Sequence, residues 1–149
     1  RVRGATEHAV TEQSRVVRFR NALGDAMSTA TEQTREAALI RAGRQMFGSH
    51  RSYSRNCGLG APETDMIVNL ARIEGPGNGL YGAKITGGGS GGTVAILAEA
   101  DAGGILSPRA NLAISRVREA FGRSTGRPPR NIDGTSHGAM LLPAIIEVW

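Results

Sequence analysis

Apolar residues recur at helical spacing in the first half of the chain. From about Thr6 to Leu23, Val, Ala and Phe fall near one helical face while Arg and Glu occupy the other, which predicts a first helix. Gly24 and Asp25 are expected to interrupt it, since both are poor helix formers. A second, longer helix is predicted from about Thr31, with a stop at Asn56-Cys57-Gly58-Leu59-Gly60.

Two further helices carry clear start signals. Pro62 suits the first turn of a third helix, whose apolar face is followed by the turn cluster Gly75-Pro76-Gly77-Asn78-Gly79. Ser107-Pro108 predicts the start of a fourth helix, which should end at Gly126. Both helices are therefore bounded by residues that either favour a first turn or cannot continue the last one.

Between the third and fourth helices the periodicity changes to two. Tyr81, Ala83 and Ile85 alternate with smaller or polar residues, and 93–98 is apolar on both faces, as in a central strand. Asn131-Ile132-Asp133 and the stretch Ile145 to Trp149 are interpreted as two short strands at the end of the chain. The order of elements predicts an α+β fold in which helices pack on an antiparallel sheet.

Composition supports a single folded domain. A chain of 149 residues with 40% hydrophobic and 21% charged residues lies in the globular class. Aromatic residues make up only 4%, so the core must be built mainly from Val, Ile, Leu, Ala and Met. The chain does not begin with Met, and we expect it to be a piece of a longer protein.

The net charge of +5 allows a polyanionic partner. The arginines are spread along the chain among glutamates and few aromatic residues accompany them, so no nucleic-acid partner is expected; ATP fits the charge as well. Cys57 is the single cysteine, and no stretch is apolar enough for a membrane span or opens the chain as a signal peptide. These features predict no membrane partner and a cytoplasmic location.

The glycine-rich stretch Gly87-Gly88-Gly89-Ser90-Gly91-Gly92 lies between the two central strands. Glycines permit backbone conformations closed to other residues, and successive exposed N–H groups can form a concave anion site. An ordinary hairpin turn is the alternative, but such a turn needs one or two glycines rather than five. No Gly-Lys-Ser/Thr follows, as in a P-loop, and a strand rather than a helix comes next, so a dinucleotide fingerprint is excluded.

Four segments together resemble the GHMP kinases of the galactokinase/arabinokinase branch. The stretch LYGAKITGGGSGGTVAIL, from Leu80 to Leu97, resembles the third motif of that superfamily, and RGATEHAVTEQSRV, from Arg3, resembles a stretch of the galactokinases. SHRSYSRNCGLG, from Ser49 to Gly60, resembles the arabinokinases, and GTSHGA, from Gly134 to Ala139, resembles a turn near the end of both families. The resemblance spans nearly the whole chain.

This resemblance implies that residues 1–149 form the carboxy-terminal domain of a sugar kinase, with a ferredoxin-like fold, and that the amino-terminal ATP-binding domain is absent. The serine-rich phosphate loop and the catalytic Asp motif of the family do not occur here. ATP, a small sugar and the protein's own amino-terminal kinase domain are the implied partners, and the ligands of Mg²⁺ would come mainly from that domain. The isolated chain is expected to be nearly inert, because phosphoryl transfer depends on positioning and charge stabilisation.

Candidate site residues follow from the loop and from that resemblance. The phosphate and sugar side of the cleft is assigned to the loop and the strand that leads into it: Lys84, Thr86, Gly87, Gly88, Gly89, Ser90, Gly91 and Gly92. Lys84 could offset phosphate charge or face solvent, and Ser136 with His137 could form a cleft turn or a purely structural one. No catalytic residue is assigned, and the three histidines and Cys57 lack metal-ligand spacing. Packing is the expected role of Cys57.

Ser90 stands where galactokinases usually carry a bulky aromatic residue, and Gly58-Leu59-Gly60 follows Cys57 where they usually have Pro-Glu-Leu. Both departures favour the arabinokinase-like branch. Three alternatives stay open: a kinase for another sugar, such as a heptose phosphate or a uronic acid; a non-catalytic sugar and nucleotide sensor of kinase ancestry; and, more weakly, a nucleic-acid-binding domain.

Overall fold

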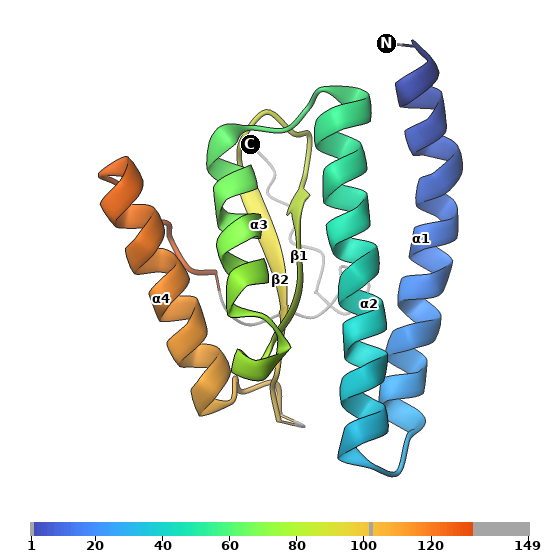
Figure 1. Cartoon of the computed structure of the whole chain (residues 1–149), viewed down its shortest axis with the longest axis vertical. Coiled ribbons are helices and arrows are strands. Elements are labelled where there is room, and N and C mark those ends of the chain that lie inside the picture. Colours follow the sequence, from blue (N-terminus) through green and yellow to red (C-terminus); the bar gives the residue numbers. More distant parts are fainter. Residues whose placement is uncertain (1, 102, 133–149) are drawn as a thin grey trace, which may run out of the picture.

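The computed structural model describes residues 2–101 and 103–132. Two long helices, α1 (Val2–Ser28) and α2 (Glu32–Ser52), form an antiparallel hairpin on one side of the molecule (Figure 1). The side chain of Thr31 caps α2 by accepting a hydrogen bond from the N–H of Thr34, as expected for a threonine before a helix.

Helix α1 does not stop at Gly24, so that expectation was wrong. Ala22 and Ala26 are both buried on the continuing helix, and Asp25 pairs with Arg41 of α2 at 2.7 Å. A glycine costs a helix about 1 kcal/mol relative to alanine. Packing of the next turn against α2 outweighs this local preference, and the helix runs on to Ser28.

The predicted stop after α2 is confirmed. The helix widens into a π-helical turn, η1 (Tyr53–Cys57), and Gly58 then takes a left-handed conformation with φ 69°. Helix α3 (Pro62–Glu74) begins with its proline in the first turn and gives way at Gly75 to a short 3-10 turn, η2 (Pro76–Asn78). Helix α4 (Pro108–Thr125) starts after the cap Ser107 and ends at Gly126, as predicted.

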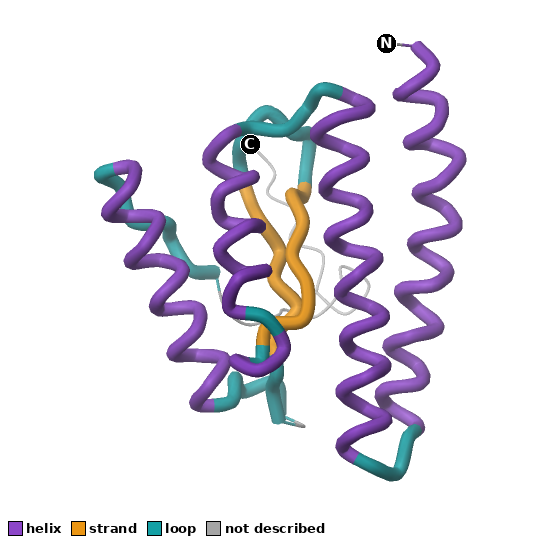
Figure 2. Tube along the Cα trace, in the orientation of Figure 1, coloured by secondary structure: helices purple, strands orange, loops and turns teal. Residues whose placement is uncertain are grey.

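Strands β1 (Leu80–Thr86) and β2 (Thr93–Ala98) pair antiparallel in a register that sets Thr86 opposite Thr93. Within the described residues the sheet has these two strands, and α3 lies across it with α4 beside it, while α2 runs along β1 (Figures 1 and 2). The α+β class is thereby confirmed.

The prediction of a strand at Asn131-Ile132-Asp133 was wrong for its first two residues, which lie outside any strand. The side chain of Ile132 is 73% exposed, so it makes no buried cross-strand contact there. Asp133 and the other predicted strand, Ile145 to Trp149, lie outside the described residues.

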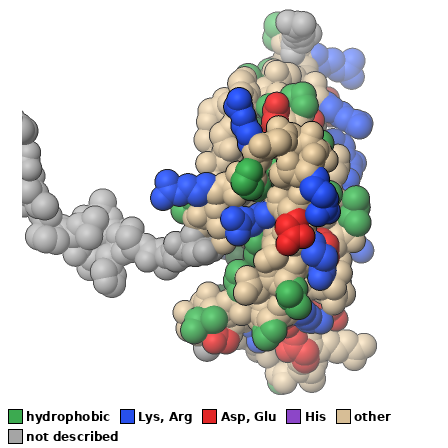
Figure 3. Space-filling view, turned by 90° about the vertical axis from the view of Figure 1, so that its left-hand side faces the viewer, with side chains coloured by type: hydrophobic (Ala, Val, Ile, Leu, Met, Phe, Trp, Pro, Cys, Tyr) green, Lys and Arg blue, Asp and Glu red, His purple; other side chains and the backbone are tan. Residues whose placement is uncertain are grey.

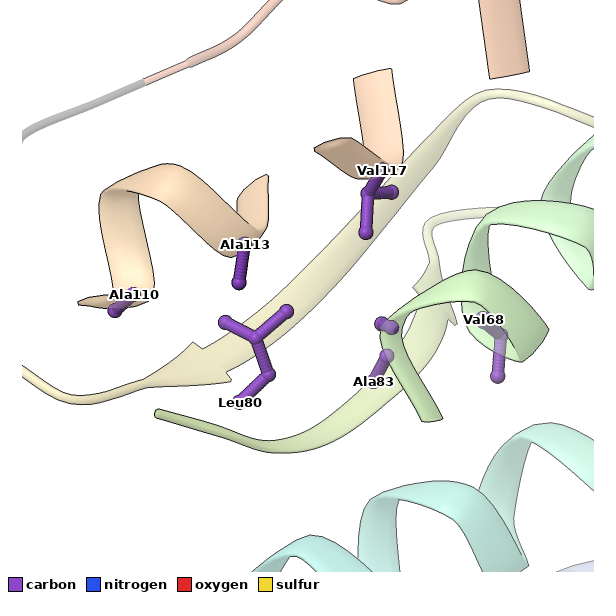
Figure 4. Close-up of a cluster of buried hydrophobic side chains, with 7 residues drawn as sticks. Val68, Leu80, Ala83, Ala110, Ala113 and Val117 are labelled. Atoms are coloured by element: carbon purple, nitrogen blue, oxygen red, sulfur yellow. The ribbon is translucent and has the colours of Figure 1, made fainter. Parts of the chain in front are cut away.

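Small aliphatic side chains build the core between α3, β1 and α4, as the low aromatic content predicted. Leu80 and Val68 are its largest fully buried members, and Figure 4 shows Leu80 of β1 beside Ala113 of α4. The buried cluster consists of Val68, Ala71, Leu80, Ala83, Ala110, Ala113 and Val117. Alanines at these positions let both helices approach the sheet closely.

On its other side β1 meets α2, and at two glycines the backbones of the two elements come close together. A Cβ atom on Gly43 would overlap the carbonyl group of Tyr81, and one on Gly82 would lie 2.5 Å from the Cα of Gly43. These two glycines therefore allow α2 to lie against the edge of β1, and this contact fixes the distance between the helical hairpin and the sheet.

Candidate functional site

The loop between β1 and β2 needs its glycines for conformation. Gly87, Gly89, Gly91 and Gly92 have φ values of 80°, 84°, 119° and 98°, in the region that residues with a Cβ rarely adopt. Ser90 shares this property with φ 57°, which costs roughly 1–2 kcal/mol for a residue other than glycine. The composition of the loop is thus explained by a tight, strongly curved path.

The loop is seated on the segment that joins α2 to α3. The N–H of Ser90 donates to the carbonyl oxygen of Leu59 at 2.7 Å. A Cβ on Gly89 would lie 2.7 Å from that same oxygen and 2.9 Å from the ring of Tyr53. The Ser49 to Gly60 segment and the glycine loop, identified separately in the sequence, therefore contact each other.

This seating modifies the simple expectation of an anion cradle. The N–H of Ser90 is used within the protein and is not directed at a ligand. Gly87, Gly88, Gly91 and Gly92 border open space, since a Cβ at any of them would meet no atom within 4 Å. The part of the loop on either side of its docked tip is accessible.

A groove with an apolar floor continues from the accessible part of the loop. Thr86, Gly91 and Gly92 line one end of it beside the first turn of α3, where Glu63 and Thr64 lie. Ile67, strand β2, residues 104–106, helix α4 and residues 127–132 contribute to the remaining lining. Among the predicted site residues the groove thus brings together Thr86, Gly91 and Gly92, and it does not include Lys84.

Lys84 faces the helical hairpin. Its Nζ lies 3.6 Å from Oε1 of Glu12 on α1, and the same carboxylate accepts hydrogen bonds from Ser49 of α2 and from Arg15. Burial alone would raise the pKa of Glu12, but these hydrogen bonds and the charge of Lys84 outweigh it, and the pKa lies below its ordinary value. Lys84 therefore ties β1 to α1, which differs from both the phosphate contact and the solvent-facing position that the sequence left open.

Sequence reasoning missed His50. Its side chain is only 7% exposed, its Nδ1 lies 3.3 Å from the N–H nitrogen of Ile85, and its Nε2 lies 3.0 Å from Oδ1 of Asp65. The signal was present, because Ala42, Met46 and His50 follow one another every four residues on the buried face of α2. Metal-ligand spacing, the criterion applied to His50 in the sequence, does not reveal such a role.

The other polar candidates have structural surroundings. His8 contacts Ser52 through Nδ1 at 3.0 Å and lies beside the ring of Tyr53, while Cys57 is partly buried in η1. Ser136 and His137 lie outside the described residues. Within residues 2–101 and 103–132, no cluster of His, Cys, Asp or Glu is arranged to hold a metal ion, and no helix is long and apolar enough to span a membrane.

Basic side chains do not gather into one continuous patch on the face seen in Figure 3, where Lys and Arg are separated by carboxylates. Several arginines are paired, as in the bidentate contacts of Arg109 with Glu99 and of Arg116 with Glu74. A broad basic surface of the kind that binds nucleic acid is not seen on that face.

Comparison with known proteins decides between the classes left open by the fold. No protein-family model matches the chain. An L-arabinokinase of Arabidopsis thaliana is 33% identical to it over 144 residues, which cover 93% of this chain. The chain is a galactokinase/arabinokinase-like GHMP kinase domain. It spans 12% of the length of that relative, so the arabinokinase-like domain described here corresponds to a small part of a much larger protein.

Proposed function

We propose that this chain is the carboxy-terminal domain of an ATP-dependent sugar 1-kinase, with L-arabinose as the first candidate substrate. The similarity to an L-arabinokinase over nearly the whole chain carries the proposal. The contact between the glycine loop and Leu59 supports it, because two of the four segments that resemble the family meet at one place. A ferredoxin-like sheet and a separate amino-terminal ATP-binding domain belong to the same proposal.

In the proposed reaction the anomeric hydroxyl oxygen of the sugar attacks the γ-phosphorus of ATP. The new O–P bond forms as the bond to the β,γ-bridging oxygen breaks, ADP leaves with that electron pair, and the sugar's proton passes to a base on the amino-terminal domain. Mg²⁺, when bound, would neutralise charge on the phosphates. Within this chain, Gly91, Gly92 and the exposed residue Thr86 border the groove where phosphate or sugar would lie.

The test compares the full-length protein with this chain alone. ADP release is measured with ATP and a panel of L-arabinose, galactose, a uronic acid and a heptose phosphate. We expect turnover by the full-length protein with one of these sugars and none by the 149-residue chain. Sugar or nucleotide binding without turnover in the full-length protein would instead favour the sensor of kinase ancestry, and robust turnover by the chain alone would overturn the proposed division between domains.

A substitution tests the role of the loop. Gly91→Ala places a Cβ at φ 119° in the part of the loop that borders the groove, whereas Gly75→Ala imposes a comparable restriction at φ 67°, at the far end of the hairpin. We expect Gly91→Ala to raise the KM for ATP or sugar about tenfold, equivalent to about 1.4 kcal/mol, and Gly75→Ala to leave both KM values near those of the wild type. Equal effects of the two variants on KM would contradict a binding role for the loop.

A further inference from the structure

Both ring nitrogens of His50 are engaged in the described structure. Nδ1 faces the N–H of Ile85 and must present its lone pair to it, so the ring proton of the neutral imidazole resides on Nε2, which donates to Asp65. Burial lowers the pKa of His50 despite the neighbouring Asp65 carboxylate. The cations Arg72 and Lys84 act in the same direction as burial, so every charged neighbour except Asp65 favours the neutral ring.

The hydrogen bond between Ile85 and His50 satisfies a backbone N–H of β1 that does not point to β2. Ile85 stands opposite Val94 in the sheet register, yet its N–H is directed to α2, on the other edge of the strand. A buried backbone N–H requires a partner, and within this environment His50 supplies it. Ile85 is two residues before Gly87, so its position determines where the glycine loop leaves the sheet.

Asp65 extends this contact to the segment that seats the tip of the loop. Its Oδ1 also accepts a hydrogen bond from Ser54 of η1 at 3.0 Å. Leu59, whose carbonyl oxygen holds the N–H of Ser90, lies between Ser54 and Asp65 in the chain. The start and the tip of the glycine loop are therefore attached to the same short region, one through His50 and the other through Leu59.

We propose that His50 is a positioning residue: held by Asp65 in the Nε2–H tautomer, it accepts the N–H of Ile85 and so fixes the glycine loop relative to helices α2 and α3. This rests on the proposed function only for its consequence in catalysis, because the hydrogen-bond relay itself is independent of any ligand. His50 would influence binding through the loop without touching the substrate.

Two amide substitutions separate the halves of the relay. In His50→Asn the side-chain oxygen can take the place of Nδ1 and accept from Ile85, whereas in His50→Gln the side-chain nitrogen can take the place of Nε2 and donate to Asp65. Hydrogen exchange of β1 is followed by mass spectrometry in the full-length protein. We expect His50→Gln to speed exchange at Ile85 by about tenfold or more, as loss of its acceptor requires, and His50→Asn to preserve most of its protection.

Steady-state kinetics of the same variants connect the relay to the proposed activity. In His50→Gln the KM for ATP or sugar should rise several-fold with a smaller change in kcat, and in His50→Asn the rise should be smaller. Ser54→Ala, which keeps the histidine and removes one donor to Asp65, should give an intermediate acceleration of exchange at Ile85. It provides the test if either histidine variant fails to fold.

Nitrogen NMR of labelled His50 provides a readout that general destabilisation does not imitate. The wild type should show an unprotonated Nδ1 and a protonated Nε2, and in Asp65→Asn the preference for this tautomer should weaken. Equal exchange rates at Ile85 in the Asn and Gln variants, or a proton on Nδ1 in the wild type, would overturn the relay even in an active kinase. A protein that shows the expected exchange pattern but no turnover would instead leave the relay standing and remove the proposed function.

Discussion

The two ends of the β1–β2 hairpin are held by different kinds of contact. At the open end, where β1 begins and β2 ends, the N–H of Glu99 donates to the carbonyl oxygen of Gly79 at 2.8 Å and the N–H of Ser107 donates to the carbonyl oxygen of Glu99 at 3.0 Å. The Glu99 carboxylate also accepts from Ser107 and, in bidentate fashion, from Arg109. Charge-assisted bonds of this kind are among the stronger ones.

Within the described residues, the loop end has an ion pair on the strand that leads into it, between Lys84 and Glu12 at 3.6 Å, and none in the uncharged loop 87–92 itself. It is attached by single hydrogen bonds, from Ile85 to His50 and from Ser90 to Leu59, and most of its glycines border open space. Leu80 of the core lies at the open end, where β1 begins. The comparison indicates that the open end supplies stability, while the loop end determines the position of the glycine loop, the element proposed to bind a ligand.

Removal of core volume at the open end should have the largest effect on the free energy of unfolding. Leu80→Ala is expected to lower the free energy of unfolding by about 3 kcal/mol, because the side chain is fully buried between α4 and the sheet. Leu112→Ala is the matched control, since Leu112 is 61% exposed on α4, and it should change stability by less than about 0.5 kcal/mol. Urea unfolding of both variants measures the difference, and a similar small loss of stability in each would show that the open end is not the stable one.

The glycine contact between α2 and β1 should come second. Gly43→Ala would force the helix away from the carbonyl of Tyr81 and is expected to cost about 2 kcal/mol. Gly24→Ala adds the same methyl group to α1 where no atom lies within 4 Å, and should stabilise the protein by about 0.5–1 kcal/mol. Thermal unfolding of the pair gives the test, and a stabilising Gly43→Ala would refute the proposed close approach.

The smallest effects should be those of pH, and they should separate the two ends. The hydrogen bonds from Arg109 and Ser107 lower the pKa of Glu99 to about 2, so its contribution is present above its ordinary pKa of 4.5 and is lost as the pH falls from there towards 2. Burial lowers the pKa of His50, so the unfolded chain takes up its proton first and stability is lost as the pH falls below 6.5.

Acidification should therefore weaken the contacts of the loop end before those of the open end. Urea unfolding across this pH range checks the order: His50→Asn should flatten the loss that begins below pH 6.5, and Glu99→Gln should flatten the loss between 4.5 and 2. If neither substitution changes the pH profile, these two groups do not distinguish the ends.

Much of the fold could be predicted because residues with strong local preferences mark where several helices begin and end. Pro62 and Gly75 for α3, and Ser107-Pro108 and Gly126 for α4, have first-turn or helix-end preferences that do not depend on distant residues. Both helices begin and end where these residues predicted. The end of α1 could not be predicted in this way, since it depends on burial of Ala26 against α2. Local preference is reliable where no tertiary contact opposes it.

The candidate site was harder to predict than the fold. Glycine content identified the loop, but alternation could not decide which side of β1 carries Lys84, because that depends on where α1 supplies Glu12. His50 was missed for a related reason. Its two partners, Asp65 and Ile85, are 15 and 35 residues away in the chain, and no local pattern reveals a hydrogen bond to a strand's outer edge.

The left-handed backbone of Ser90 has a consequence for mutational tolerance at this position. Its side chain is exposed, and such positions usually accept most amino acids, yet φ 57° penalises every β-branched residue. A saturation library should retain Gly, Asn and Asp at 90 and lose Val, Ile and Thr. Sequence restriction at this surface position would then reflect the shape of the chain, and by itself it would not mark a contact with sugar or nucleotide.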